Sequence, residues 1–492
     1  MILDLAAEAS IETIETDVAI IGSGPAGISL ASRLKRDCCV IESGGLALDI
    51  RNHWRFHSVN AGDQTNVDSL RVRGVGGASL RWTGRCIALD PYDFEDRPWI
   101  AESSWPIDYE DLVPWFESAG DLMELQSADI LERFPSKDLE NIMASDGRWR
   151  PCVWRFADDR AHGMFRFGVR MAPVFKSETR HLFYHAHCAQ ILADAGKVRG
   201  LLLVTESGRQ VTVKARHIVI AAGCVESSRL MLDTHRTHPA LLGSVEPWLG
   251  RGFNQHLRVD AGQVHLSPSW RRPLQKQTTI FRRKGVTLAE RGLAIDPDFA
   301  RRERIGNASL NLRFERQEGP SVSDFWARVR GRVLDEPAAF SNPHVSLEID
   351  TEQTVTKDSR IELADELDPL GRPRASVRWT ISETDCRTAY VTAKAFGDFA
   401  RSHGLGTLDL APGLRLDNVA FDARRDSNHQ LGGTRMSETP ATGVVNRDLR
   451  VHGVPNLSVI GGSVFSTGGH ANPTQAIVAL ALRLADCLDA ET

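Results

Sequence analysis

A glycine-rich turn between an apolar strand and a helix, near the N-terminus, constrains the fold more than any other feature. The segment reads Asp17-Val-Ala-Ile-Ile-Gly-Ser-Gly-Pro-Ala-Gly27. Its continuous apolar run, Val18–Ile21, is typical of a parallel strand that is covered on both faces. The residues from Gly24 to Arg36 carry apolar side chains at helical spacing. A parallel sheet with covering helices is therefore expected to begin here.

The three glycines of this turn have the G-x-G-x-x-G spacing of a dinucleotide-binding loop. Gly22 permits the tight turn, Gly24 lets the backbone approach a pyrophosphate, and Gly27 lets the helix pack on the strand. The phosphates would lie at the helix N-terminus, where free N–H groups and the dipole favour anions. Glu42 ends the next strand about 20 residues later, at the position of a carboxylate that binds ribose hydroxyls. The alternative is a glycine-rich turn without a ligand.

Length, composition and charge bound the class of protein. At 492 residues the chain is long enough for two or more domains, and its 42% hydrophobic and 25% charged residues are ordinary for a globular protein. The net charge of −5 argues against a nucleic-acid partner. No stretch approaches the about 18 apolar residues of a membrane span. The N-terminus lacks the pattern of a secretory signal, so we expect a cytoplasmic protein without a membrane partner.

The cysteines do not predict a metal site. They are scattered, without a C-x-x-C pair, which fits neither zinc nor an iron–sulfur cluster. We expect reduced thiols and no metal. The eight positions are Cys38, Cys39, Cys86, Cys152, Cys188, Cys224, Cys386 and Cys487.

Two further segments favour FAD over NAD as the dinucleotide. Residues 73–83 form a second glycine-rich loop, which would wrap backbone around an extended flavin. Residues 218–223, followed by an apolar helix, form a second strand–glycine–helix unit. Near the C-terminus a histidine turn at 429–436, a buried strand at 456–463 and an Asn-Pro helix start at 468–474 follow one another. That order suits a base and a hydrogen-bond donor facing a flat redox cofactor.

These patterns predict an α/β fold (α+β overall). A Rossmann-like FAD-binding domain with a β-meander at about 182–213 would be joined to a substrate domain. The substrate domain would be a largely antiparallel sheet covered by helices, closed by a helix at about Glu383–His403. The expected segments are 1–105 (FAD-binding domain, first part), 106–176 (substrate domain or lid, first part), 177–257 (FAD-binding domain, second part), 258–408 (substrate-binding domain) and 409–492 (FAD-binding domain and catalytic segment).

On these motifs the chain resembles the glucose–methanol–choline (GMC) family of flavin oxidoreductases. Within it, the chain is most similar to the branch of pyranose oxidase and of bacterial sugar and polyol dehydrogenases. The resemblance covers nearly the whole chain. It is strongest at 15–45, 71–85, 216–232 and 427–485, and weakest across 258–345.

The resemblance implies roles for individual residues. It assigns His429 as the catalytic base and Asn472 as its partner at the substrate hydroxyl. Trp82 and Thr83 would line the flavin, with Thr83 near its reactive N5, and Cys188 would offer main-chain contacts to adenine. The positions expected at the cofactor are Gly22, Gly24, Pro25, Ala26, Gly27, Glu42, Ser43, Arg73, Gly76, Gly77, Ser79, Trp82, Thr83, Cys188, Ala222, Gly223, Gly462, Ser463, His470, Asn472, Pro473 and Thr474.

One position departs from the family pattern. Pyranose oxidase has a histidine, bonded covalently to the flavin, before its Trp-Thr pair, whereas this chain has Arg81. The departure implies FAD that is bound non-covalently.

The chemistry of the C-terminal residues agrees with these roles but leaves alternatives. Histidine, with an unperturbed pKa of about 6.5, has a neutral, proton-accepting form near pH 7. His429 could instead hold its loop by hydrogen bonds. Asn472 is also a good helix N-cap and Pro473 a good first helical residue. His470 competes as a pocket residue, whereas His256 and His452 are expected to be structural.

The expected function is FAD-dependent oxidation of a CH–OH group of a sugar, glycoside, polyol or related alcohol to a carbonyl. Oxygen or another acceptor would reoxidise the flavin. One alternative is a non-redox lyase that keeps FAD, as hydroxynitrile lyases of the family do. Another is oxidation of an amino-sugar intermediate in antibiotic biosynthesis, and an NAD-linked dehydrogenase is a further class. The specific substrate and the oligomeric state stay open.

Overall fold

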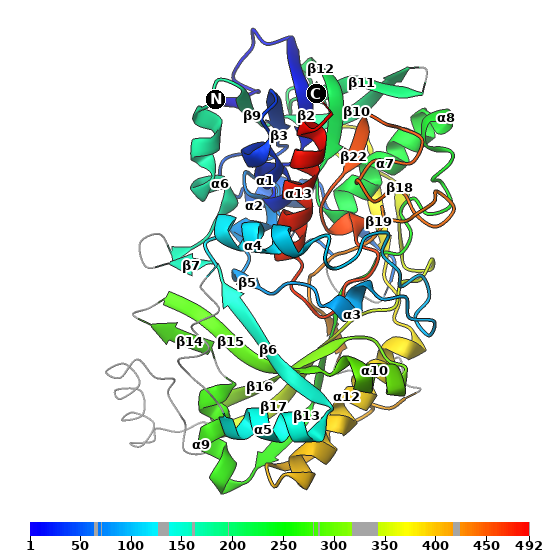
Figure 1. Cartoon of the computed structure of the whole chain (residues 1–492). Coiled ribbons are helices and arrows are strands. Elements are labelled where there is room, and N and C mark those ends of the chain that lie inside the picture. Colours follow the sequence, from blue (N-terminus) through cyan, green and yellow to red (C-terminus); the bar gives the residue numbers. More distant parts are fainter. Residues whose placement is uncertain are drawn as a thin grey trace.

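The computed structural model describes residues 1–62, 67–69, 71–125, 137–159, 163–194, 196–278, 280–283, 286–316, 343–416 and 424–491. Within these ranges the chain forms two large sheets, which occupy the upper and lower parts of Figure 1. Both chain termini lie at the upper end, beside the first sheet. The predicted α/β fold with two kinds of sheet is confirmed.

The first sheet combines parallel strands with a β-meander. In spatial order its strands are β1 (Ile2–Asp4), β9 (Arg180–Tyr184), β3 (Cys38–Ile41), β2 (Thr13–Ile21), β12 (Gln210–Ile220), β11 (Lys197–Val204) and β10 (His187–Asp194), with β22 (Leu457–Val459) beside β12. Neighbouring strands from β1 to β12 are parallel, and so are β12 and β22. The strands β10, β11 and β12 are antiparallel, as the expected meander requires.

Two helices from opposite ends of the sequence cover this sheet together. Helix α1 (Pro25–Arg33) follows the glycine turn, and α13 (Thr474–Asp489) closes the chain. They pack against each other, and α4 (Val113–Leu122) packs on α13. Arg33 and Asp486 form an ion pair at 2.8 Å across the two. The N- and C-terminal motifs are thereby brought to one end of the sheet (Figure 1).

The second sheet is antiparallel and is the one expected for the substrate domain. Its strands are β20 (Gly406–Leu410), β13 (Leu257–Leu266), β17 (Pro343–Thr351), β16 (Ala308–Arg316), β15 (Val286–Ile295), β6 (Trp149–Phe156) and β5 (Arg85–Cys86), with β14 (Ile280–Arg283) beside β15 and β21 (Arg424–Asp426) beside β13. Strand β5 thus lies within the segment 1–105 but pairs with the second sheet.

The long helix α12 (Glu383–Ser402) packs against this sheet, and its prediction from the sequence is confirmed. Ser382 caps it, because its Oγ accepts a hydrogen bond from the Asp385 N–H at 3.2 Å. Helix α5 (Lys137–Asp146) packs on β6.

The remaining elements complete the described chain. They are α2 (Ile50–Arg55), β4 (Val59–Asn60), η1 (Gly77–Leu80), α3 (Pro91–Phe94), β7 (Asp158–Asp159), β8 (Gly163–Met164), α6 (Phe167–Arg170), η3 (Ala172–Lys176), α7 (Cys224–Thr237), α8 (Pro239–Leu242), α9 (Pro268–Gln277), α10 (Pro297–Glu303), β18 (Arg360–Leu367), β19 (Pro373–Arg378) and η4 (Gly462–Val464). None of the helices in the described ranges combines the length and apolar character needed to cross a bilayer.

Candidate active site

A cavity of about 660 Å³ lies between the glycine-rich end of the first sheet and one face of the second. Its walls come from the two glycine loops, the end of β3, the junction of β12 with α7, and strands of the second sheet. The C-terminal loops that carry His429 and Asn472 complete it. A volume between about 300 and 1,000 Å³ is usual for a small-molecule or cofactor site.

The first glycine loop has the geometry expected of a dinucleotide turn. Gly22 has a φ of +106°, which L side chains rarely adopt. A Cβ atom at Gly27 would lie 1.9 Å from the Gly22 carbonyl oxygen, so only glycine lets α1 pack here. At Gly24, by contrast, a Cβ atom would meet no described atom within 4 Å. Gly24 lines the cavity, and its missing side chain leaves space there.

The carboxylate of Glu42 is held at the end of β3, where it lines the cavity. Its Oε2 accepts hydrogen bonds from the Ser23 N–H at 3.2 Å and the Ser23 hydroxyl at 2.6 Å. Its Oε1 accepts one from the Gly44 N–H at 2.8 Å. These bonds fix the carboxylate at the end of β3, the position at which a dinucleotide-binding fold needs an acid to bind the ribose.

The second glycine loop touches the first. A Cβ atom at Gly77 would lie 2.9 Å from the Gly24 Cα, so the two loops meet at glycine backbone. The Ser79 hydroxyl donates to the Gly76 carbonyl at 2.7 Å, and the Trp82 Nε1–H donates to the Phe165 carbonyl at 2.7 Å. These bonds hold Trp82 and its neighbour Thr83 on the cavity wall.

Most positions expected at the cofactor lie on the cavity wall. They are Gly22, Gly24, Pro25, Ala26, Glu42, Ser43, Arg73, Gly77, Trp82, Thr83, Cys188, Ala222, Gly223, Gly462, Asn472, Pro473 and Thr474. The positions Gly27, Gly76, Ser79, Ser463 and His470 do not line it. Gly27 and Ser79 instead serve the packing of the two loops, as described above.

His429 and Asn472, from separate C-terminal loops, meet at the cavity. The Asn472 Nδ2 lies 3.1 Å from the His429 Nε2, and both side chains line the cavity. The helix-capping interpretation of Asn472 is wrong: α13 begins at Thr474, its N-cap is Pro473, and no side chain caps it. The amide of Asn472 faces His429, because the loop turns its side chain away from the helix end.

His256, which the sequence marked as structural, lies directly behind His429. Its Nδ1 is 2.9 Å from the Nδ1 of His429, and its Nε2 is 3.3 Å from the Gly468 carbonyl oxygen. Its side chain is buried. The two histidines are 173 positions apart in the sequence, so no local pattern could have revealed this contact.

Both histidines have a lowered pKa. Burial, followed by the repulsion that a protonated His256 would exert, holds the pKa of His429 well below its usual value. Burial lowers the pKa of His256 to about 4. Both rings are therefore neutral near pH 7, which is the state a proton acceptor needs.

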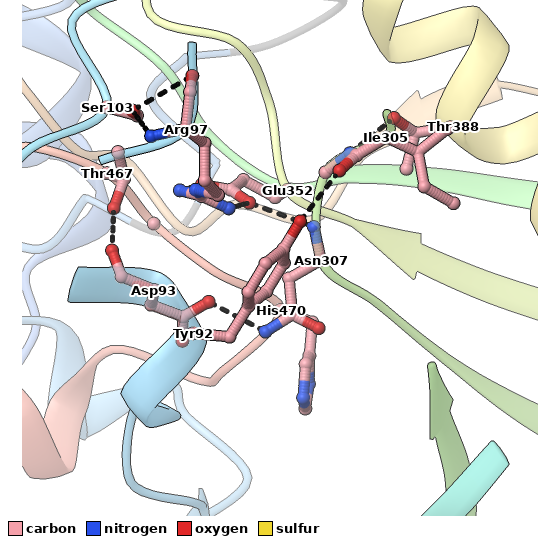
Figure 2. Close-up of polar contacts among 12 residues, drawn as sticks. Tyr92, Asp93, Arg97, Ser103, Ile305, Asn307, Glu352, Thr388, Thr467 and His470 are labelled. Carbon is pink, nitrogen blue, oxygen red and sulfur yellow. Dashed lines mark hydrogen bonds and ion pairs between the residues drawn. The ribbon is translucent and has the colours of Figure 1, made fainter. Parts of the chain in front are cut away.

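His470 lies on the buried side of the loop that carries Asn472. Its Nε2 is 3.0 Å from Asp90 Oδ2. Beside it, Asp93 Oδ1 accepts a hydrogen bond from Asn307 Nδ2 at 2.7 Å, and the Asp93 carbonyl accepts one from the Thr467 hydroxyl at 2.9 Å (Figure 2). His470 therefore does not line the cavity, and its ring instead anchors the loop to Asp90, the N-cap residue of α3.

The same network ties the loop to the second sheet. Arg97 and Glu352, both buried, form two hydrogen bonds at 2.6 and 2.7 Å (Figure 2). Glu352 Oε2 also accepts the Asn307 N–H at 2.9 Å. The loop that presents Asn472 is therefore braced from behind by paired charges.

The second sheet presents charged side chains to the cavity. Arg85, Arg258, Glu290 and Arg313 all line it. Glu290 pairs with Arg85 Nε at 2.8 Å and with Arg313 Nη1 at 2.6 Å. Behind them, Asp350 holds Arg258 through two bonds of 2.7 Å, and Glu348 holds Arg313 at 2.6 Å. The three arginines and three acids balance in charge.

Comparisons with known proteins agree with this geometry. A family model described as GMC oxidoreductase matches residues 355–481. The chain is 23% identical to 2-methyl-1,2-propanediol dehydrogenase of Mycolicibacterium austroafricanum, over 96% of this chain and 95% of the relative. It is 22% identical to the fructose dehydrogenase large subunit of Gluconobacter japonicus (97% and 98% covered). It is 24% identical to paromamine 6'-oxidase of Streptomyces fradiae (95% and 90% covered).

Solved structures share the fold. Pyridoxine 4-oxidase from Mesorbium loti superposes with a TM-score of 0.61 at 17% identity, over 96% of this chain and 99% of the other. Formate oxidase superposes with a TM-score of 0.60 at 14% identity, over 98% and 99%.

Fold, cavity and comparisons together define a flavin-dependent oxidoreductase. Residues 355–481 match the GMC oxidoreductase model, the chain as a whole is similar to GMC oxidoreductases, and FAD is its cofactor. The residues present fit that cofactor. A Cβ atom at Gly24, Gly223 or Gly461 would meet no described atom within 4 Å, and all three positions face the cavity, so the wall leaves a continuous space free of side chains.

Proposed function

We propose that this chain oxidises a CH–OH group of a sugar, glycoside or related polyol to a carbonyl, with His429 as the base. The contact of the His429 Nε2 with the Asn472 amide at the cavity carries the proposal. Bound FAD supplies the two-electron acceptor, which takes the carbon-bound hydrogen as hydride while the hydroxyl proton goes to His429. Atoms and charges then balance for the conversion of an alcohol to a carbonyl.

The two side chains divide the work on the hydroxyl group. The neutral His429 Nε2 accepts the hydroxyl proton, and the Asn472 Nδ2–H donates a hydrogen bond to the substrate oxygen. Both groups lie within 3.1 Å of one another, so one oxygen can contact both. Holding the hydroxyl between a donor and an acceptor orients it and favours loss of its proton.

The charged wall supports a polyhydroxylated substrate. An apolar alcohol would displace water from Arg258, Glu290 and Arg313 without replacing the hydrogen bonds that the water makes, and this loss is unfavourable. Hydroxyl groups can donate to Glu290 and accept from the arginines. Because the wall is balanced in charge, it suits a neutral ligand better than an anionic one. Relatives named for a propanediol, for fructose and for paromamine agree with this choice.

The remaining cofactor contacts are part of the proposal. Gly24 would approach the pyrophosphate, Glu42 would bind ribose hydroxyls, and the backbone near Cys188 would contact adenine. Thr83 would lie near the flavin N5. The residue directly before Trp82 is Arg81 and not a histidine, and its side chain is hydrogen-bonded to the Ser69 carbonyl at 3.0 Å, so the FAD would be held without a covalent bond.

Anaerobic stopped-flow spectroscopy tests this function. The holoenzyme is mixed with fructose, glucose, a methyl glycoside, sorbitol and an amino sugar, and in parallel with hexanol and benzyl alcohol. We expect the flavin absorbance at about 450 nm to decrease with at least one polyhydroxylated compound and to stay unchanged with the apolar alcohols. A flavin that stays oxidised with every polyol, or that is bleached fastest by hexanol, would contradict the proposal. Release of yellow FAD on acid precipitation checks the non-covalent link.

A further inference from the structure

The contacts of His256 decide which nitrogen of that ring carries a proton. A carbonyl oxygen only accepts hydrogen bonds, so the contact of the His256 Nε2 with the Gly468 carbonyl at 3.3 Å requires a proton on Nε2. A neutral imidazole has one N–H, so the His256 Nδ1 then carries a lone pair. That lone pair points at His429.

The proton position of His429 follows from this. Its Nδ1 lies 2.9 Å from the His256 Nδ1, and two lone pairs at that distance would repel. The proton must therefore lie on the His429 Nδ1, which donates it to His256. The His429 Nε2 is left with a lone pair on the cavity side, where Asn472 Nδ2 faces it as a donor at 3.1 Å. Each contact in this series of hydrogen bonds joins one donor to one acceptor.

We propose that His256 is a positioning residue that holds neutral His429 in the Nδ1–H tautomer, so that its Nε2 is available as the base. This inference rests on the proposed function, because it explains how His429 is kept ready to accept the hydroxyl proton. His256 touches neither substrate nor cofactor in this role, since it lies behind His429 and is not on the cavity wall.

The surroundings of His256 make it suited to the task. The ring is buried, and β13, whose Arg258 pairs with Asp350 of the neighbouring strand β17, begins at the next residue. Gly468 is in the loop that also carries Asn472, so one loop fixes both ends of the chain of hydrogen bonds. A second acceptor for the His429 Nδ1–H, the Ser427 hydroxyl, lies 3.2 Å away.

Imidazole ¹⁵N NMR reads the tautomer directly, without turnover. Oxidised holoenzyme is labelled at histidine, and the His429 signals are assigned by their loss in His429→Asn. Protonated and unprotonated ring nitrogens have well-separated chemical shifts. We expect an unprotonated Nε2 in the wild type and a shift toward a protonated Nε2 in His256→Leu. His256→Asn, whose Oδ1 can accept from the His429 Nδ1–H, should restore the wild-type signals.

Anaerobic flavin reduction should follow the same order. Loss of tautomer control in a catalytic triad costs about 10⁴-fold in kcat. Because Ser427 remains as a weaker acceptor, we expect His256→Leu to slow the reduction step by about 10–100-fold. The substrate Kd should stay unchanged, and His256→Asn should recover most of the rate. His217→Leu is the matched control, since His217 is also buried but bonds to Ser458, away from the cavity.

Three results would overturn the inference. They are a protonated Nε2 in the wild type, a His256→Leu protein with wild-type signals and rate, and equal loss in the Leu and Asn variants. If His256→Leu does not fold, the wild-type spectrum and the Asn variant still decide. Wild-type NMR is independent of any substrate, so failure of the proposed function would show separately, as no reduction of wild-type flavin by any polyol.

Discussion

The two large sheets meet at one cavity but contribute to it in different ways. The first sheet offers backbone: its strands end in glycine turns, and its central strand residues Val18, Ala19 and Ile20 are fully buried and apolar. The second sheet offers side chains, because Arg258, Glu290 and Arg313 lie within its strands and line the cavity wall. Recognition on one side thus depends on the absence of side chains, and on the other side on paired charges.

This difference separates the requirements for binding the cofactor from those for the substrate. A side chain added to the glycine half should exclude FAD without disturbing the charged half. A charge removed from the second sheet should cost stability and substrate affinity without affecting the phosphate site. The variants below test that separation.

Gly24→Val should have the largest effect, a complete loss of FAD. Its backbone is extended (φ −72°), which valine adopts readily, and a Cβ atom there meets no described atom within 4 Å. The protein should therefore fold, while the side chain fills the space left for phosphate. The measurement is the flavin absorbance of purified protein beside its circular dichroism. A yellow Gly24→Val protein would show that the loop does not bind the dinucleotide.

Gly27→Ala is the matched control, because it places a methyl group on the same loop where no space exists. Its Cβ would lie 1.9 Å from the Gly22 carbonyl oxygen. We expect about 3 kcal/mol of lost unfolding free energy, the scale of an overpacked core. If Gly24→Val unfolds as readily as Gly27→Ala, the distinction between a binding glycine and a packing glycine is wrong.

His429→Ala should keep FAD and lose flavin reduction by about 10²–10⁴-fold, the usual contribution of a general base. The cofactor half is untouched, so the flavin spectrum should match that of the wild type. The measurement is the anaerobic reduction rate with saturating substrate. A reduction rate within about threefold of the wild-type rate would mean that another group takes the proton.

The pH dependence of wild-type reduction follows from the lowered pKa of His429. The base works in its neutral form, and burial extends that form below pH 6.5. The reduction rate should therefore stay level from about pH 8 to about pH 6.5 and fall only as the pH drops through the lowered pKa. A fall centred at or above pH 6.5 would contradict the burial of this ring in the holoenzyme. Stopped-flow traces across that range measure it.

The sequence predicted the strands and glycine turns of the first sheet well. It did not predict the side-chain contacts of the second sheet and of the C-terminal loops, because these depend on tertiary structure. Runs such as Val18–Ile21 carry a local signal, so the parallel strands and their glycine turns could be placed. The pairing of Glu290 with Arg85 and Arg313 depends on strand register, which no short pattern contains. His470 and Asn472 are two residues apart, and only the course of the loop decides which one faces the cavity.

Glu290→Gln tests the charged half. Glu290 is buried between Arg85 and Arg313, so its neutral replacement leaves two cations with weaker partners. Removing one member of a buried ion network costs about 3 kcal/mol or more, whereas Ile20→Val in the apolar sheet should cost about 1 kcal/mol. Urea unfolding of the two variants measures the contrast. Equal costs would mean that the wall is solvated and does not act as a buried network.

Asn472→Ala should have the smallest effect, about a tenfold slower reduction, the loss expected for one hydrogen bond of about 1.4 kcal/mol to the reacting oxygen. The removed amide donates toward the His429 side of the cavity and does not cap α13, whose N-cap is Pro473. Loss of a helix cap costs about 1 kcal/mol, and the unfolding free energy should therefore change by less than this amount.

Asn472→Asp is the companion variant, since a carboxylate keeps the shape but cannot donate. A rate defect shared by both variants, with unchanged stability, assigns the donor role to the amide. If Asn472→Ala instead loses about 1 kcal/mol of unfolding free energy without a rate defect, Asn472 caps α13. His429 would then be the sole side chain that acts on the hydroxyl.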